Sequence, residues 1–129
     1  LADCAEHGTL PQPLVTPASM LPETVLDSLE GKKLLDFGLA VEVDTFRFEN
    51  NYCILPISLV IAYALAIATS GQASRIFLAG FDGYGADDAR NNEMDALLKQ
   101  YMQAPGAISL TAVTPSRYQI PQSSIYYVV

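Results

Sequence analysis

The stretch that decides the fold is Arg75-Ile76-Phe77-Leu78-Ala79, followed by Gly80-Phe81-Asp82-Gly83-Tyr84-Gly85. The first five residues are almost continuously apolar, which predicts a strand of a parallel sheet covered on both faces. The glycine-rich residues 80–85 predict a tight turn, because glycine adopts backbone conformations closed to other residues. A helix capped by Asp87 or Asp88 is expected next. Its apolar face recurs at helical spacing: Met94, Leu97, Leu98, Tyr101 and Met102.

The same alternation of strands and helices continues on both sides of this unit. Upstream we expect a strand at residues 14–16, a helix over 21–31 and a strand over 33–43, whose later part alternates apolar and polar residues. Downstream, residues 108–113 predict a strand, and the tail after it is irregular or an added edge strand. This order predicts an α/β fold: a three-layer, Rossmann-like, open and mostly parallel sheet with helices on both faces.

Residues 52–69 carry no charge, which raises the question of a membrane span. A span needs about 20 apolar residues, and this stretch is shorter and contains Pro56 and Ser58. We expect instead a helix that starts near Pro56, ends before Gly71 and buries nearly its whole surface. No membrane partner is predicted.

The composition suits one globular domain. The chain has 129 residues, half of them apolar and 16% charged, with a formal net charge of −7. Nucleic acid is not an expected partner, because its binding needs a basic surface. We take residues 1–12 as a lead-in or linker and 13–129 as a single Rossmann-like domain, excised from a longer chain.

Charge is spread unevenly along the sequence. From Ala104 to the end, Arg117 is the only charged residue. Such a cation is either paired with an acid from elsewhere in the fold or free to meet an anionic ligand, and we favour the pairing.

Cysteine and histidine are too few for most sites that need them. The two cysteines, Cys4 and Cys53, form no CxxC pair, and the one histidine is His7. Structural zinc normally takes four such ligands, so no metal is expected in this fragment. A catalytic triad is hard to build, since Cys53 enters an apolar segment where thiols are usually inert. The low cysteine content indicates a reducing, cytoplasmic setting.

Two loops follow predicted strands at their carboxyl ends, where open α/β sheets bind ligands. Asp82 in the first loop could bind a hydroxyl or a cation, although capping of local N–H groups is the favoured interpretation. The second loop offers hydroxyls and a guanidinium to a phosphate or carboxylate, and a solvent-facing turn is an equal alternative. For a small anionic or sugar-like ligand, the candidate contacts are Asp82, Gly83, Tyr84, Thr114, Ser116, Arg117 and Tyr118.

Several segments resemble a known family: residues 75–84, Asp87-Asp88-Ala89-Arg90, Asn92-Glu93, residues 114–118 and Ser124-Ile125-Tyr126. Over residues 33–126 the chain resembles the C-terminal domain of HMG-CoA-lyase-like (4-hydroxy-2-oxovalerate aldolase-like) proteins, which are often associated with surface-polysaccharide genes. This resemblance implies an N-terminal catalytic barrel that holds a divalent metal in a longer chain. The barrel's ligands have no counterpart here. A weaker resemblance links the strand and its GFD turn to Rossmann-like domains of bacterial sialyltransferases and of pterin pyrophosphokinase-like proteins.

Three functions follow from these observations. The first is an accessory, ligand-binding domain of an aldolase in carbohydrate metabolism, without aldol chemistry of its own. The second is a glycosyl- or nucleotidyl-transferase-like domain that uses Asp82, with Mg²⁺ as a candidate ion. The third is an oligomerisation module, in which the charge-free residues 52–69 and the neutral tail contact a second copy. The first requires residues 80–85 and 114–118 to lie side by side.

Overall fold

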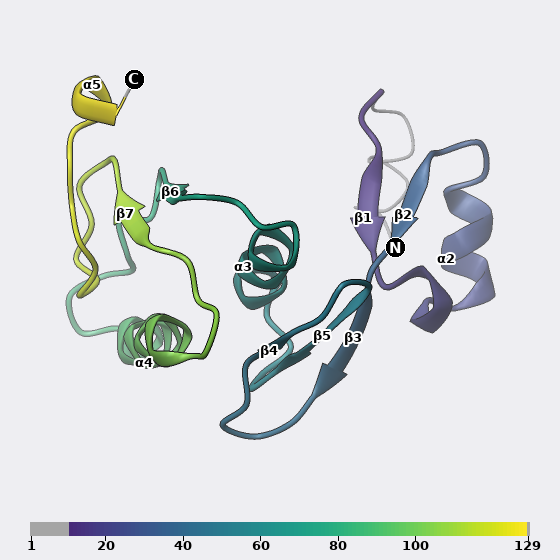
Figure 1. Cartoon of the computed structure of the whole chain (residues 1–129), viewed down its shortest axis with the longest axis horizontal. Coiled ribbons are helices and arrows are strands. Elements are labelled where there is room, and N and C mark those ends of the chain that lie inside the picture. Colours follow the sequence, from purple (N-terminus) through teal and green to yellow (C-terminus); the bar gives the residue numbers. More distant parts are fainter. Residues whose placement is uncertain (1–10, 129) are drawn as a thin grey trace.

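Short strands and helices make up the fold of residues 11–128, the part of the chain that this computed structural model describes (Figure 1). Most of the predicted lead-in, with Cys4 and His7, lies outside the described residues. The elements are β1 (Leu14–Thr16), the 3-10 helix η1 (Ala18–Met20), α2 (Glu23–Ser28), β2 (Leu34–Asp36), β3 (Gly38–Val41), β4 (Arg47–Phe48), β5 (Tyr52–Leu55), α3 (Val60–Ser70), β6 (Ile76–Leu78), α4 (Ala89–Gln103), β7 (Leu110–Ala112) and α5 (Ile125–Val128).

The strands of the described residues pair in three small sheets. β1 and β2 are parallel, β6 and β7 are parallel, and the middle sheet has the order β3-β5-β4, in which β4 is antiparallel to β5. Figure 1 shows the sheets following one another along the molecule, with α3 between the middle sheet and the β6–β7 pair. The mixture of helices and parallel strands predicted for an α/β protein is present. The predicted single sheet is not, because no hydrogen bonds join the three sheets of residues 11–128.

The predicted strand over residues 33–43 is wrong as a single element. The chain changes sheets at Phe37, whose N–H donates to the Thr16 carbonyl, whereas the next N–H, of Gly38, donates to the Asn51 carbonyl. A Cβ at Gly38 would lie 2.9 Å from the Tyr52 Cβ, so the close pairing of β3 with β5 requires glycine here. The strand also ends at Val41, before the alternating residues do.

The charge-free segment also divides differently from the prediction. Its first four residues form β5, the central strand of the middle sheet, whose Cys53 and Leu55 side chains are fully buried in the hydrophobic core. The helix begins at Val60 instead of near Pro56 and ends before Gly71 as expected. Four of its eleven residues are buried, and Val60 and Ala64 are exposed, so the helix does not bury nearly its whole surface as expected. In residues 11–128 no helix has the length and apolar character that crossing a membrane requires.

The strand, turn, helix and strand predicted between residues 75 and 113 are present in that order, but β6 is not covered on both faces as expected, since Phe77 is 40% exposed. Ile76–Leu78 and Leu110–Ala112 are strands, and α4 lies between them in the chain. The Asp88 carboxylate accepts a hydrogen bond from the Arg90 N–H, which caps the first turn of α4.

A buried chain of hydrogen bonds holds α4 against α3 and the start of β7. The fully buried Tyr101 hydroxyl accepts from the Ile108 N–H at 3.0 Å and lies 2.6 Å from Thr69 Oγ1. Thr69 in turn donates to the Leu65 carbonyl, so the Tyr101 hydroxyl donates to Thr69. Each proton of this hydrogen-bond network has one acceptor. The hydrogen bonds therefore all run in one direction, and each bond polarises the next.

The ring of Tyr101 is fixed as firmly as its hydroxyl. Phe46 and Phe48 meet it in edge-to-face geometry, with ring centroids 5.6 and 5.8 Å away. The main hydrophobic core forms around this residue and includes Leu55, Leu65 and Leu98.

Tyr101→Phe should lower the free energy of unfolding by about 1–3 kcal/mol, because it leaves the Ile108 N–H without an acceptor and removes the hydrogen bond to Thr69 Oγ1 while keeping the ring. Urea denaturation followed by circular dichroism measures the change. Tyr126→Phe is the matched control, since Tyr126 is 90% exposed, and it should change stability by less than about 0.5 kcal/mol. Equal effects of the two substitutions would contradict the importance of the buried network.

Candidate functional site

The loops after β6 and β7 lie side by side at one edge, because these two strands are parallel neighbours. The Gly80 N–H donates to Thr114 Oγ1 at 2.8 Å, and the Arg117 N–H donates to the Asp82 carbonyl at 3.1 Å. The expected juxtaposition of residues 80–85 and 114–118 is therefore present.

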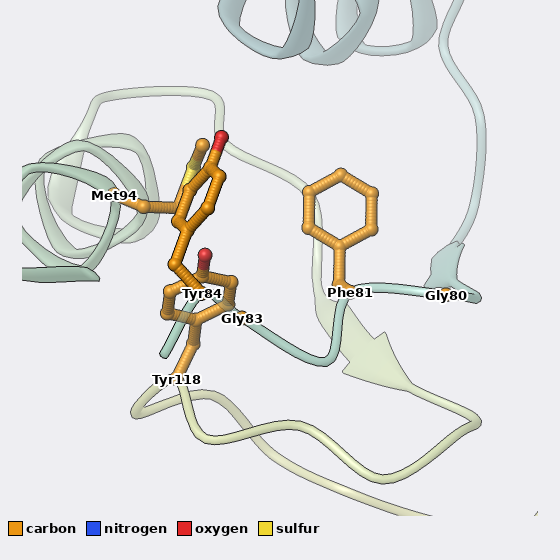
Figure 2. A pocket seen from close by; sticks show the side chains of 6 residues that line it. All are labelled: Gly80, Phe81, Gly83, Tyr84, Met94 and Tyr118. Atoms are coloured by element: carbon orange, nitrogen blue, oxygen red, sulfur yellow. The ribbon is translucent and has the colours of Figure 1, made fainter. Parts of the chain in front are cut away.

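A shallow pocket of about 270 Å³ opens between these loops and α4 (Figure 2). Aromatic and thioether side chains make up most of its wall, and glycines form the remainder. The lining residues are Gly80, Phe81, Gly83, Tyr84, Met94 and Tyr118.

Three of the seven predicted contact residues line this pocket, namely Gly83, Tyr84 and Tyr118. The other four do not. Asp82 is exposed and contributes its backbone carbonyl to the loop pairing. The Thr114 hydroxyl accepts the Gly80 N–H, and the Ser116 hydroxyl accepts the Tyr118 N–H at 3.2 Å, so both act within the loops.

The two tyrosines of the pocket differ in exposure. Tyr118 is only 5% exposed, and Tyr84 is 40% exposed. Burial, followed by the negative potential of Tyr84 and Asp95, raises the pKa of Tyr118, and Arg117 opposes that rise. The Tyr118 phenol therefore stays neutral at physiological pH and is available to a ligand as both hydrogen-bond donor and acceptor.

Arg90 covers the outer side of Tyr84 instead of reaching a ligand. Its guanidinium carbon lies 3.9 Å from the centre of the Tyr84 ring, within cation–π range. The same guanidinium forms an ion pair with Asp88 at 2.6 Å. The hydrogen bonds from Arg90 lower the pKa of Asp88 to about 2.

Arg117 has no salt-bridge partner within residues 11–128, and its side chain is exposed there without a hydrogen bond. The favoured prediction of an ion pair is therefore wrong for the described part of the chain. The aliphatic part of Arg117 passes over Gly83, where a Cβ would collide with it and where φ is +105°. Glycine at position 83 thus brings the one cation of the second loop to the rim of the pocket.

Asn91 was missed by the sequence analysis, although it holds the first loop in place. It is 8% exposed; its Oδ1 accepts the Tyr84 N–H at 2.8 Å, and its Nδ2 donates to the Gly85 carbonyl at 2.8 Å. The available indication was its spacing, because it precedes Met94 by three residues and Leu98 by seven. A polar side chain on an apolar helix face must find partners inside the fold.

The described residues contain no group of three or more His, Cys, Asp or Glu side chains placed to hold a metal ion. Burial raises the pKa of the Cys53 thiol to about 11, so this residue is a poor nucleophile. No family model, curated protein or solved structure matches this chain. The resemblance to aldolase-like proteins therefore stays a prediction.

Asn91→Ala should destabilise the protein by roughly 1–3 kcal/mol and loosen residues 83–85, because the Tyr84 N–H and Gly85 carbonyl lose their partner. Chemical denaturation gives the first effect, and amide hydrogen exchange at Tyr84 gives the second. Asn92→Ala, at the exposed neighbouring position, is the control. Unchanged exchange at Tyr84 in the Asn91 variant would show that other contacts hold the turn.

Lowering the pH from 4 to 2 should weaken the N-terminal turn of α4. The folded-state pKa of Asp88 is depressed to about 2 from an ordinary value of 3.8, so its contribution is complete above about pH 4 and is lost as it protonates. A carboxyl-carbon NMR titration measures this pKa. In Arg90→Gln the pKa should move back toward 3.8, and an identical titration in both proteins would refute the assigned cause.

Proposed function

We propose that this chain is a ligand-binding domain whose pocket at the β6–β7 edge takes one ring of a small, sugar-like molecule. The observation that carries the proposal is the aromatic pocket, built where the carboxyl ends of two parallel strands meet, as ligand sites in α/β proteins commonly are. Its volume of about 270 Å³ lies just below the usual range for small-molecule sites, about 300–1,000 Å³. It therefore suits a single ring better than a dinucleotide.

The chemistry of the wall favours a ring with one apolar face and a hydroxylated edge. Phe81, Met94 and the half-exposed Tyr84 offer apolar surface to the C–H face of a sugar. The Tyr118 phenol supplies a neutral hydrogen-bonding group. Asp82, exposed in the first loop between the lining residues Phe81 and Gly83, would accept a hydrogen bond from a ligand hydroxyl.

The charged side chains around the pocket limit the number of negative charges that a ligand can carry. Arg117 is the one cation of the second loop, and Arg90 is already paired with Asp88. Asp82 and Asp87 are exposed acids of the neighbouring segment. One guanidinium suits one anionic substituent, so a neutral sugar or a sugar monophosphate fits better than a nucleotide diphosphate. This balance favours a binding role over a transferase that uses a nucleotide-sugar donor.

Two wider expectations form part of the same proposal. The pairs β3–β5 and β6–β7 would be interrupted parts of one three-layer, Rossmann-like sheet. The domain would be accessory to an aldolase-like barrel in a longer chain, with the barrel supplying the metal and the carbon–carbon bond chemistry. The inert environment of Cys53 supports a non-catalytic role.

Thermal unfolding with glucose, galactose, glucose 6-phosphate, UDP-glucose and ATP tests the proposal. A neutral sugar or the monophosphate should raise the melting temperature, since a ligand at 100 times its Kd stabilises by about 2.7 kcal/mol. The nucleotides should have a smaller effect. Tyr84→Ala should abolish the response, and Tyr126→Ala, far more exposed, should preserve it. Absence of a response to every compound, or an undiminished response in Tyr84→Ala, would overturn the assignment.

A further inference from the structure

A second hollow lies at the carboxyl ends of β3 and β5. The two strands are parallel, and the Glu42 N–H donates to the Leu55 carbonyl just beyond β3. The chain then leads to Val43 on one side and Ile57 on the other, which are 79% and 48% exposed. Two aliphatic side chains are therefore left uncovered where the paired strands end.

These side chains belong to a groove made of two adjoining pockets. One has a volume of about 270 Å³ and includes Val43 and Ile57, and the other has about 310 Å³ and includes Thr45 and Phe46. Both are lined by Asp44 and Gln100, so the two pockets are neighbours that share part of their wall.

One stripe of α4 forms the opposite wall of the groove. Its lining residues Glu93, Ala96, Gln100 and Gln103 recur every three or four positions, so they share a helix face. Met94, by contrast, lines the pocket at the β6–β7 edge. Ten residues of helix span about 15 Å, which is the length of roughly four or five residues of extended peptide.

The wall chemistry identifies the kind of occupant. The carboxylates of Asp44 and Glu93 are exposed, the carboxamides of Gln100 and Gln103 suit peptide N–H and C=O groups, and neither pocket is lined by Lys or Arg. The nearby Arg47 is bound to Glu49 at 2.7 Å. The groove therefore combines uncovered aliphatic surface with two carboxylates and no lining cation.

We propose that this groove docks an extended segment of a partner protein in which basic and aliphatic side chains alternate. Alternation provides an extended peptide with both kinds of side chain within a few residues, so its aliphatic side chains contact Val43 and Ile57 while its basic side chains reach the carboxylates of Asp44 and Glu93, which line the same pocket. A second copy of this chain is disfavoured as occupant, because its net charge is −7 and residues 1–49 carry nine acids against three bases.

A fluorescein-labelled seven-residue peptide of alternating valine and lysine is the probe, with fluorescence anisotropy as the measurement. It should bind the full chain, and the double variant Asp44→Asn, Glu93→Gln should weaken binding about five- to tenfold, as expected for two exposed ion pairs. Asp27→Asn with Glu30→Gln removes the same charge from exposed positions on and after α2 and should leave the affinity unchanged.

Amide chemical shifts of the unaltered protein locate the peptide without any substitution, and the perturbed residues should be 43–46, 56–57 and 93–103. Tyr84→Ala should not alter this binding, which separates the groove from the sugar pocket. The proposal is overturned if a valine–glutamate peptide binds equally well, if both double variants weaken binding alike, or if the shifts fall elsewhere. Concentration-dependent dimers in light scattering, dispersed by the peptide, would assign the groove to a second copy instead.

Discussion

The buried hydroxyl of Tyr101 is the constraint on which the rest of the structure depends. A hydroxyl without exposure must have its hydrogen bonds satisfied inside the fold. Here the Ile108 N–H before β7 and the Thr69 hydroxyl of α3 do so, and Thr69 in turn donates to a carbonyl of its own helix. The C-terminal half of α4 is thereby held between α3 and β7. Because a helix is rigid, its N-terminal half is held too, with Met94 beside one hollow and Glu93 beside the other.

The local sequence was enough to predict those elements that depend on interactions between residues close together in the chain. The apolar run of β6, the aspartate cap and the 3.6-residue repeat of α4 all act within one turn or one strand, so periodicity was sufficient. The middle sheet could not be found this way. β4 has two residues and β5 has four, which are too few for a periodic pattern to show. The change of sheets at Phe37 depends on Gly38 approaching Tyr52, a contact between segments distant in the chain.

The candidate site, likewise, could be predicted only in part from the sequence. That the two loops meet follows from strand direction alone, and the structure confirms it. Which side chains face the pocket depends on the turn itself: φ of +105° at Gly83 and the two hydrogen bonds of Asn91 turn Tyr84 toward the pocket and leave Asp82 outside its wall. The sequence also could not show that Arg117 forms no ion pair within residues 11–128, because pairing depends on whether an acidic side chain from another segment comes within reach.

The two hollows beside α4 differ in charge, and this difference argues against one ligand spanning both. At the β6–β7 edge the Arg117 guanidinium, which has no salt-bridge partner within residues 11–128, lies beside a neutral, aromatic wall. Across the helix, two carboxylates stand over aliphatic surface without a cation in the lining. An anionic group attracted to Arg117 would be repelled by Asp44 and Glu93. A basic group would be attracted by these two carboxylates and repelled by Arg117. The charges beside the two hollows, from Arg117 on one side of α4 and from Asp44 and Glu93 on the other, therefore favour different ligands at the two proposed sites.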